Sequence, residues 1–132
     1  MTKTFEGLDA FTYALDLMVQ VYEITEPFPK REWYGLASQL RRASVSVVSN
    51  IAEGQGRLTD GEWRQHLSHA RGSLFEIEAQ LIAAERLGFI DPSIRDAVRQ
   101  SAKRTAKPLA GLIAFVRKRE ASRATGHRQP ST

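Results

Sequence analysis

The sequence predicts an all-α protein that folds as an up-down-up-down antiparallel four-helix bundle. Apolar residues recur at spacings of three and four through four long segments, which is the period of an amphipathic helix. Short segments rich in proline, glycine and aspartate separate these four helices. No segment shows the alternating pattern of a strand, and four helices joined by short loops are typical of an antiparallel bundle.

The first two helices are expected over residues 8–25 and 31–53. The first has two apolar stripes side by side: Leu8, Phe11, Leu15, Met18 and Tyr22, then Ala10, Ala14, Leu17, Val21 and Ile24. PFPK at 27–30 should end it, because proline lacks an amide donor. The second helix has one main stripe: Trp33, Leu36, Leu40, Ala43, Val47 and Ile51. Gly54 and Gly56 favour a cap at its C-terminal end.

The third helix has the clearest pattern. Thr59 or Asp60 can cap it, and Thr59 with Glu62 three residues later matches a capping box. Its expected buried seam alternates spacings of four and three: Trp63, Leu67, Ala70, Leu74, Ile77, Leu81, Ala84 and Gly88. Asp91 and Pro92 favour the start of a fourth helix, which should run to about residue 119 with a kink at Pro108. Its expected buried face comprises Ile94, Val98, Ser101, Ala102, Leu109, Leu112, Ile113 and Val116.

The 132 residues are enough for one domain, with the bundle expected over 1–120 and a disordered basic and polar tail over 121–132. Cysteine is absent, so disulfides and thiolate sites are excluded, and no apolar run reaches the ~18 residues of a membrane span. We therefore expect a cytoplasmic protein. Residues 1–40 carry three basic and six acidic side chains, and residues 41–132 carry sixteen and nine. This asymmetry favours an anionic partner or association of copies through opposite charges.

The segment QLRRASVSVVSNIAEGQGR at 39–57 is small or apolar on nearly all sides of the expected helix. Such a helix is typically buried on more than one side. Close packing inside one chain would explain it. We favour contact with a second copy, in which the charged residues at both ends form a polar rim. The residues expected at this contact are Arg41, Arg42, Ser44, Val45, Val48, Ala52, Glu53 and Arg57.

The same segment, with the residues before it, resembles a known protein family. YGLASQLRRASVSVVSNIAEGQGR is similar to the hallmark of proteins encoded by intervening sequences in bacterial 23S rRNA genes. EPFPKREWYGL, HARGSLFEIEAQL and AERLGFI are similar as well, and the resemblance covers about residues 5–112. It implies a four-helix bundle that assembles into a homo-oligomeric ring, typically a pentamer, and associates with RNA. A related branch, the accessory proteins of diversity-generating retroelements, implies docking of a reverse transcriptase.

Cations on the fourth helix are the expected nucleic-acid contacts. Arg95, Arg99, Lys103 and Lys107 recur every four residues, and Arg117, Lys118 and Arg119 continue the positive charge. Cations on one helix ridge lie about 6 Å apart and can follow a phosphate backbone. The alternative is a solvated helix face. Aromatic residues do not interleave with these cations, so stacking on single-stranded bases is not supported.

Other chemistry has little support. Glu62, His66 and His69 have a spacing that could present ligands to a metal, but the sequence lacks the second motif that two-metal bundles use. The segment 54–57 fits a helix cap better than an anion-binding nest. The serines have no evident histidine and acid partners. We therefore expect no metal, no cofactor and no enzyme activity. The leading hypothesis is a non-catalytic RNA-binding or ribonucleoprotein accessory protein. The alternative is a scaffold that docks an enzyme such as a reverse transcriptase without binding RNA by itself.

Overall fold

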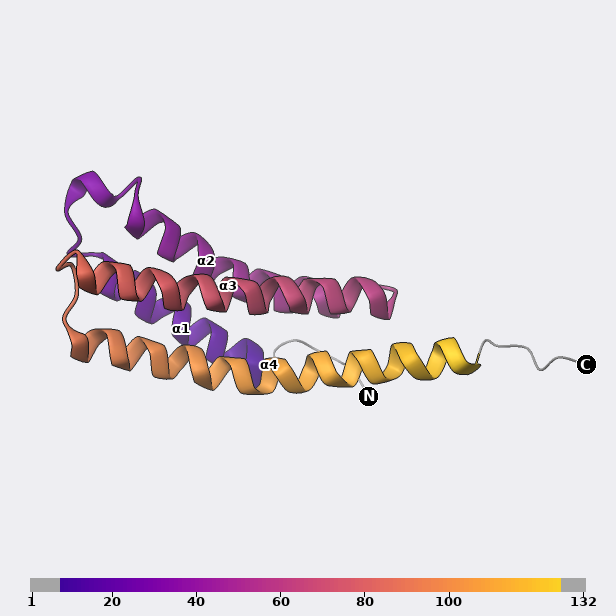
Figure 1. Ribbon diagram of the computed structural model, residues 1–132. Coiled ribbons are helices and arrows are strands. Elements are labelled where there is room, and N and C mark those ends of the chain that lie inside the picture. Colours follow the sequence, from indigo (N-terminus) through magenta and orange to yellow (C-terminus); the bar gives the residue numbers. More distant parts are fainter. Residues whose placement is uncertain (1–7, 127–132) are drawn as a thin grey trace, which may run out of the picture.

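The computed structural model describes residues 8–126 and confirms an all-α bundle of four helices (Figure 1). They are α1 (Asp9–Thr25), α2 (Leu36–Gln55), α3 (Asp60–Arg86) and α4 (Pro92–Gly126), and a short 3-10 helix, η2 (Lys30–Glu32), precedes α2. Successive helices run in opposite directions. Each helix packs against the next one in the chain, and α4 packs back against α1. The diagonal pairs do not contact each other within this part of the chain.

The α3 seam lies in the core as the sequence predicts, from Trp63 to Ala84. The Thr59 hydroxyl accepts a hydrogen bond from the Glu62 amide at 3.2 Å and caps the helix. Gly88 does not extend the seam. It lies just beyond the helix with a φ of +80°, where a glycine backbone is favoured. The Phe89 amide donates back to the Ala84 carbonyl at 2.9 Å, which ends the helix.

The sequence shows two apolar stripes on α1, and the structure decides which of them is buried. The second stripe forms the core, with Thr25 buried in place of the half-buried Ile24. The first stripe is half-buried at most, and Tyr22 is 41% exposed. The reason is that α1 contacts both α2 and α4, so its side between those two neighbours faces the centre. Small and medium side chains fill that side, and the larger ones lie toward the surface.

The second helix begins later than residue 31. Gly35 has φ −111° and ψ −119°, which is not helical, and it separates η2 from α2. The Glu32 carboxylate of η2 accepts a hydrogen bond from the Leu36 amide at 3.0 Å, so a side chain outside α2 caps its first turn. Trp33, predicted in the buried stripe, therefore lies before the helix and is 48% exposed.

The fourth helix continues without interruption through Pro108 to Gly126. Residues 121–126, expected in the disordered tail, are helical, and residues 127–132 lie outside the described residues. Asp60 at the start of α3 explains the longer helix, because it lies 3.6 Å from Arg119 and 3.2 Å from Arg123. The Asp60 side chain is only 9% exposed. The buried face of α4 includes Thr105, which the sequence did not predict, whereas Ile94 is 38% exposed.

Residues 8–126 contain no helix with the length and apolar character that crossing a membrane requires.

Gly54 lets α2 and α3 approach each other closely. The prediction that it forms part of the C-terminal cap of α2 is wrong, because it lies within the helix. It is buried inside α2, and within residues 8–126 only Gly88 has a positive φ. A Cβ at position 54 would lie 2.8 Å from Cδ1 of Trp63 and 3.3 Å from Cβ of His66. Trp63 is 7% exposed and has little room to move. Glycine at this position therefore fits a contact too close for any side chain.

We expect Gly54→Ala to lower the free energy of unfolding by about 1–3 kcal/mol, because the added methyl group overpacks the Trp63 contact. Gly111→Ala is the matched control, because Gly111 also lies within a helix but a Cβ there meets nothing within 4 Å. That change should raise the stability by about 0.5–1 kcal/mol. Urea denaturation of both variants gives the comparison, and equal effects would contradict the close-contact explanation.

Candidate nucleic-acid interface and association surface

The cations of the first half of α4 divide into engaged and free side chains. Arg95 pairs with the carboxylates of Glu85 on α3 and Asp96. The hydrogen bond with Asp96 is the main cause that raises the pKa of Arg95 above its ordinary value. Arg99 is half-buried, and its Nε has no hydrogen-bond partner. Arg95 is therefore held by carboxylates of its own chain, whereas Arg99 is only partly accessible.

Lys103 and Lys107 are exposed and make no ion pair within residues 8–126. Arg104 is exposed beside them, and its guanidinium lies 4.4 Å from the centre of the Tyr13 ring on α1. Sequence reasoning missed Arg104, because it lies off the ridge with the spacing of four. Its adjacency to Lys103 was the available signal. These three cations are free to meet an anion.

The cations near the end of α4 divide in the same way. Arg117 and Lys118 are exposed and make no ion pair in the described part of the chain. Arg119 is half-buried, with its guanidinium 3.6 Å from Asp60 and 5.6 Å from the centre of the Phe115 ring. Glu120 pairs with Arg64 at 2.6 Å. Arg119 therefore belongs to the contact that holds α4 on α3, whereas Arg117 and Lys118 face solvent.

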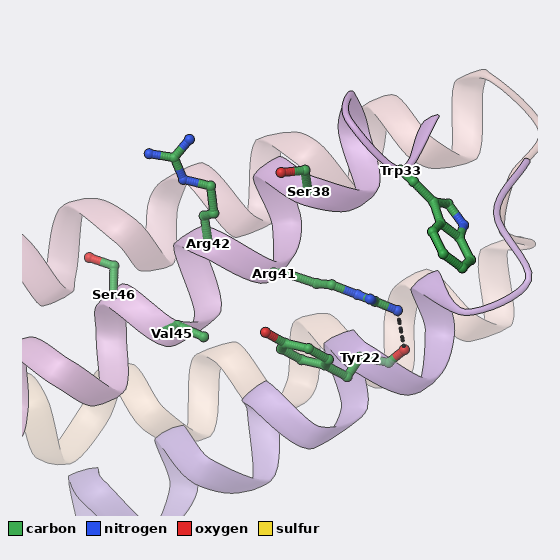
Figure 2. A pocket seen from close by; sticks show the side chains of 7 residues that line it. All are labelled: Tyr22, Trp33, Ser38, Arg41, Arg42, Val45 and Ser46. Carbon is green, nitrogen blue, oxygen red and sulfur yellow. Dashed lines mark hydrogen bonds between the residues drawn. The ribbon is translucent and has the colours of Figure 1, made fainter. Parts of the chain in front are cut away.

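The adjacent arginines of α2, Arg41 and Arg42, point in opposite directions (Figure 2). Arg41 points to α1, where Nε donates to the Thr25 hydroxyl at 2.8 Å and Nη2 lies 3.2 Å from the Glu26 carboxylate. Its guanidinium also lies 4.7 Å from the centre of the Tyr22 ring. Arg42 points away from α1 and makes no ion pair within residues 8–126. Arg41 therefore joins two helices of one chain, and Arg42 is the exposed member.

A shallow pocket of about 490 Å³ lies on this outer side of α2 (Figure 2). Its lining residues are Tyr22, Trp33, Ser38, Arg41, Arg42, Val45 and Ser46. Val45 is 37% exposed, and the aromatic rings belong to α1 and to the turn before α2. The pocket thus combines aromatic, aliphatic and cationic groups.

The remaining residues of the predicted association surface are less accessible. Ser44 is fully buried inside the chain, where its hydroxyl donates to the Arg41 carbonyl at 2.8 Å. Val48 and Ala52 are half-buried. The exposed Glu53 lies 3.7 Å from Arg57 and 3.6 Å from His66. The structure therefore leaves Arg42 and Val45 as the exposed, unpaired part of the predicted set.

The histidines of α3 do not form a metal site with their neighbours. Nδ1 of His66 lies 2.9 Å from the side-chain oxygen of Asn50 on α2, so this ring takes part in helix packing. Residues 8–126 contain no cluster of three histidine, aspartate or glutamate side chains suited to a metal ion.

Comparison with known proteins identifies both a family and a similar fold. Residues 6–111 match the family described as 23S rRNA-intervening sequence protein. The fold is similar to a crystal structure of a protein of unknown function from the S23 ribosomal protein family of Bacteroides thetaiotaomicron VPI-5482. That match has a TM-score of 0.73 at 17% identity and covers 80% of this chain and 95% of that chain. No curated protein matches the sequence significantly.

We expect Arg41→Ala to lower the free energy of unfolding by about 1–2 kcal/mol, because a hydrogen-bonded link between α1 and α2 is lost. Arg42→Ala removes the same side chain from the next position and should change stability by no more than about 0.5 kcal/mol in dilute solution. Chemical denaturation at equal protein concentration measures both. The assignment of Arg41 to the fold would be wrong if Arg42→Ala were the more damaging change.

Proposed function

The chain belongs to the 23S rRNA-intervening sequence protein family, and from this premise we propose that it binds structured RNA without catalysing a reaction. One observation carries the proposal: residues 97–119 of α4 contain no acidic side chain. The acids of α4, Asp96 and Glu120, are both engaged with arginines. The exposed cations of this helix therefore meet little compensating charge along its length. A phosphate backbone would supply that charge and release its counterions.

The contact surface of this proposal consists of the exposed cations of α4 for which no ion pair is found within residues 8–126: Lys103, Arg104, Lys107, Arg117 and Lys118. The spacing of Lys107 and Lys118 is eleven residues, or about three helical turns, so they lie on one side of α4. Contacts of this kind bind the backbone and carry no base sequence. RNA shape would then select the partner, since double-stranded RNA is recognised chiefly by its shape and backbone.

We also propose that copies of the chain associate into a homo-oligomeric ring, with five copies as the resemblance implies. Arg42 and Val45 on the outer side of α2 support this, because an exposed apolar side chain beside an unpaired arginine is common at protein interfaces. A ring would place several α4 helices on one particle. Weak phosphate contacts then act together and increase the overall affinity without new contacts.

The salt dependence of RNA binding tests the first proposal. A labelled RNA hairpin, titrated with purified protein between about 50 and 200 mM salt, should bind with an affinity that falls steeply with salt. Lys107→Ala and Lys118→Ala should each lower the slope of log affinity against log salt by about one for every chain in contact with the RNA. Lys30→Ala is the control, because Lys30 is exposed on η2, away from α4.

Fluorescence anisotropy provides the measurement. An unchanged slope in both α4 variants would contradict the contact surface. Failure of the wild-type protein to bind RNA alone would contradict the proposal itself. RNA that enters a complex only when a reverse transcriptase is added would instead support the enzyme-docking alternative.

Val45→Asp tests the association surface. A buried, unpaired carboxylate is strongly unfavourable, so the variant should have the mass of a single 14.8 kDa chain where the wild type is larger. Leu58→Asp is the matched control, because Leu58 is 97% exposed in the loop between α2 and α3. Light scattering coupled to size-exclusion chromatography gives both masses. A wild-type protein that stays monomeric at high concentration would refute association.

A further inference from the structure

A cavity of about 170 Å³ opens between α3 and α4, which run side by side (Figure 1). The Phe75 ring on α3 and the small side chains of Ala106 and Ala110 on α4 are among its walls. Lys103 lines it as well, so the cavity adjoins the cations that we propose to bind RNA. The aromatic ring beside these cations belongs to another helix, which is why the spacing within α4 does not show it.

The volume of the cavity suits one six-membered ring. A cavity of about 150 Å³ lined by apolar side chains can hold a benzene molecule. A pyrimidine base has one ring of that size, whereas the second ring of a purine would remain outside. Phe75 is 66% exposed, so its ring is accessible for a base to stack on.

Charged side chains line the two ends of the cavity. Ion pairs near both ends of the contact between α3 and α4 fix the register of these antiparallel helices. Glu78 therefore lies level with Lys103, and Arg71 lies level with Ala110. Glu78 and Arg71 are about 10 Å apart along α3, with Phe75 between them on the same side of the helix. Neither of the two makes an ion pair within residues 8–126.

We propose that this cavity receives one unpaired cytosine from a loop or bulge of the bound RNA. The proposal rests on the RNA binding proposed above and adds the recognition of one base. The cytosine ring stacks on Phe75, and its N4 amino group donates to the Glu78 carboxylate. Arg71 and Lys103 bind the phosphates on either side of the extruded nucleotide.

The Glu78 carboxylate favours cytosine over uracil. Cytosine presents an amino donor at the position where uracil carries an oxygen acceptor, and two acceptors repel each other. Contacts to phosphates position a nucleic acid, and contacts to bases select its sequence. Proteins that read RNA sequence mostly reach unstacked bases in loops and bulges. The cavity would thus add base selectivity to a row of cations that has none by itself.

Three labelled hairpins that differ at one position test this proposal. One stem is fully paired, one carries a single bulged cytosine, and one carries a bulged uridine at the same place. At fixed salt, the wild-type protein should bind the cytosine hairpin about tenfold more tightly than the paired one, because a stacked base is gained. The uridine hairpin should gain less. Fluorescence anisotropy measures all three affinities.

Two variants separate stacking from base selection. Phe75→Ala should weaken binding of the cytosine hairpin about tenfold and leave the paired hairpin and the salt slope unchanged, because the ring contacts no phosphate. Glu78→Gln should bring cytosine and uridine to similar affinities, because a side-chain amide both donates and accepts. Leu87→Ala is the matched control, because Leu87 is 60% exposed at the end of α3 and does not line the cavity.

The outcomes distinguish this pocket from RNA binding as such. If the paired hairpin binds but a bulged cytosine adds nothing, or if Phe75→Ala weakens all three hairpins equally, the base pocket is wrong while RNA binding stands. If uridine binds as tightly as cytosine, the role of Glu78 is wrong. If the wild type binds none of the hairpins, both proposals fail. Phe75 is exposed, so circular dichroism should show an unchanged fold in Phe75→Ala.

Discussion

Packing around α3 is the constraint on which the rest of the structure depends. Its alternating seam is buried from Trp63 to Ala84, and the helix contacts α2 on one side and α4 on the other. Both neighbours are fixed at specific points, α2 by Gly54 against Trp63 and α4 by Asp60 with its two arginines. The outer sides of α2 and α4, which carry the proposed association and RNA surfaces, are oriented by these contacts.

The sequence predicts the fold well where one periodic pattern dominates. The α3 seam, the Thr59 cap and the turn at Gly88 to Pro92 follow from local spacing and turn chemistry. The stripe of α1 could not be chosen from sequence, because both stripes are apolar and only the positions of α2 and α4 decide which is buried. The end of α4 depends on ion pairs of Arg119 and Arg123 with Asp60, which is distant in the chain, and local composition does not report them.

The candidate site shows the same limit. Helix periodicity identifies the cations of α4, but it does not show that Arg95 and Arg119 are engaged by acids of α3. For the adjacent arginines of α2, the sequence gives no indication that one crosses to Thr25 and the other faces solvent. Ser44 shows that a small polar residue next to an apolar stripe can be buried in its own chain. Residue type therefore suggests candidates, and tertiary contacts decide which remain accessible.

The contact between Gly54 and Trp63 has a consequence for how the sequence can diverge. An indole at 63 leaves no room for a Cβ at 54, so position 54 is restricted to glycine as long as Trp63 is present. Larger residues at 54 become acceptable only in homologues that carry a smaller residue at 63. The two positions should therefore co-vary, and glycine near the end of this helix should persist wherever the tryptophan does.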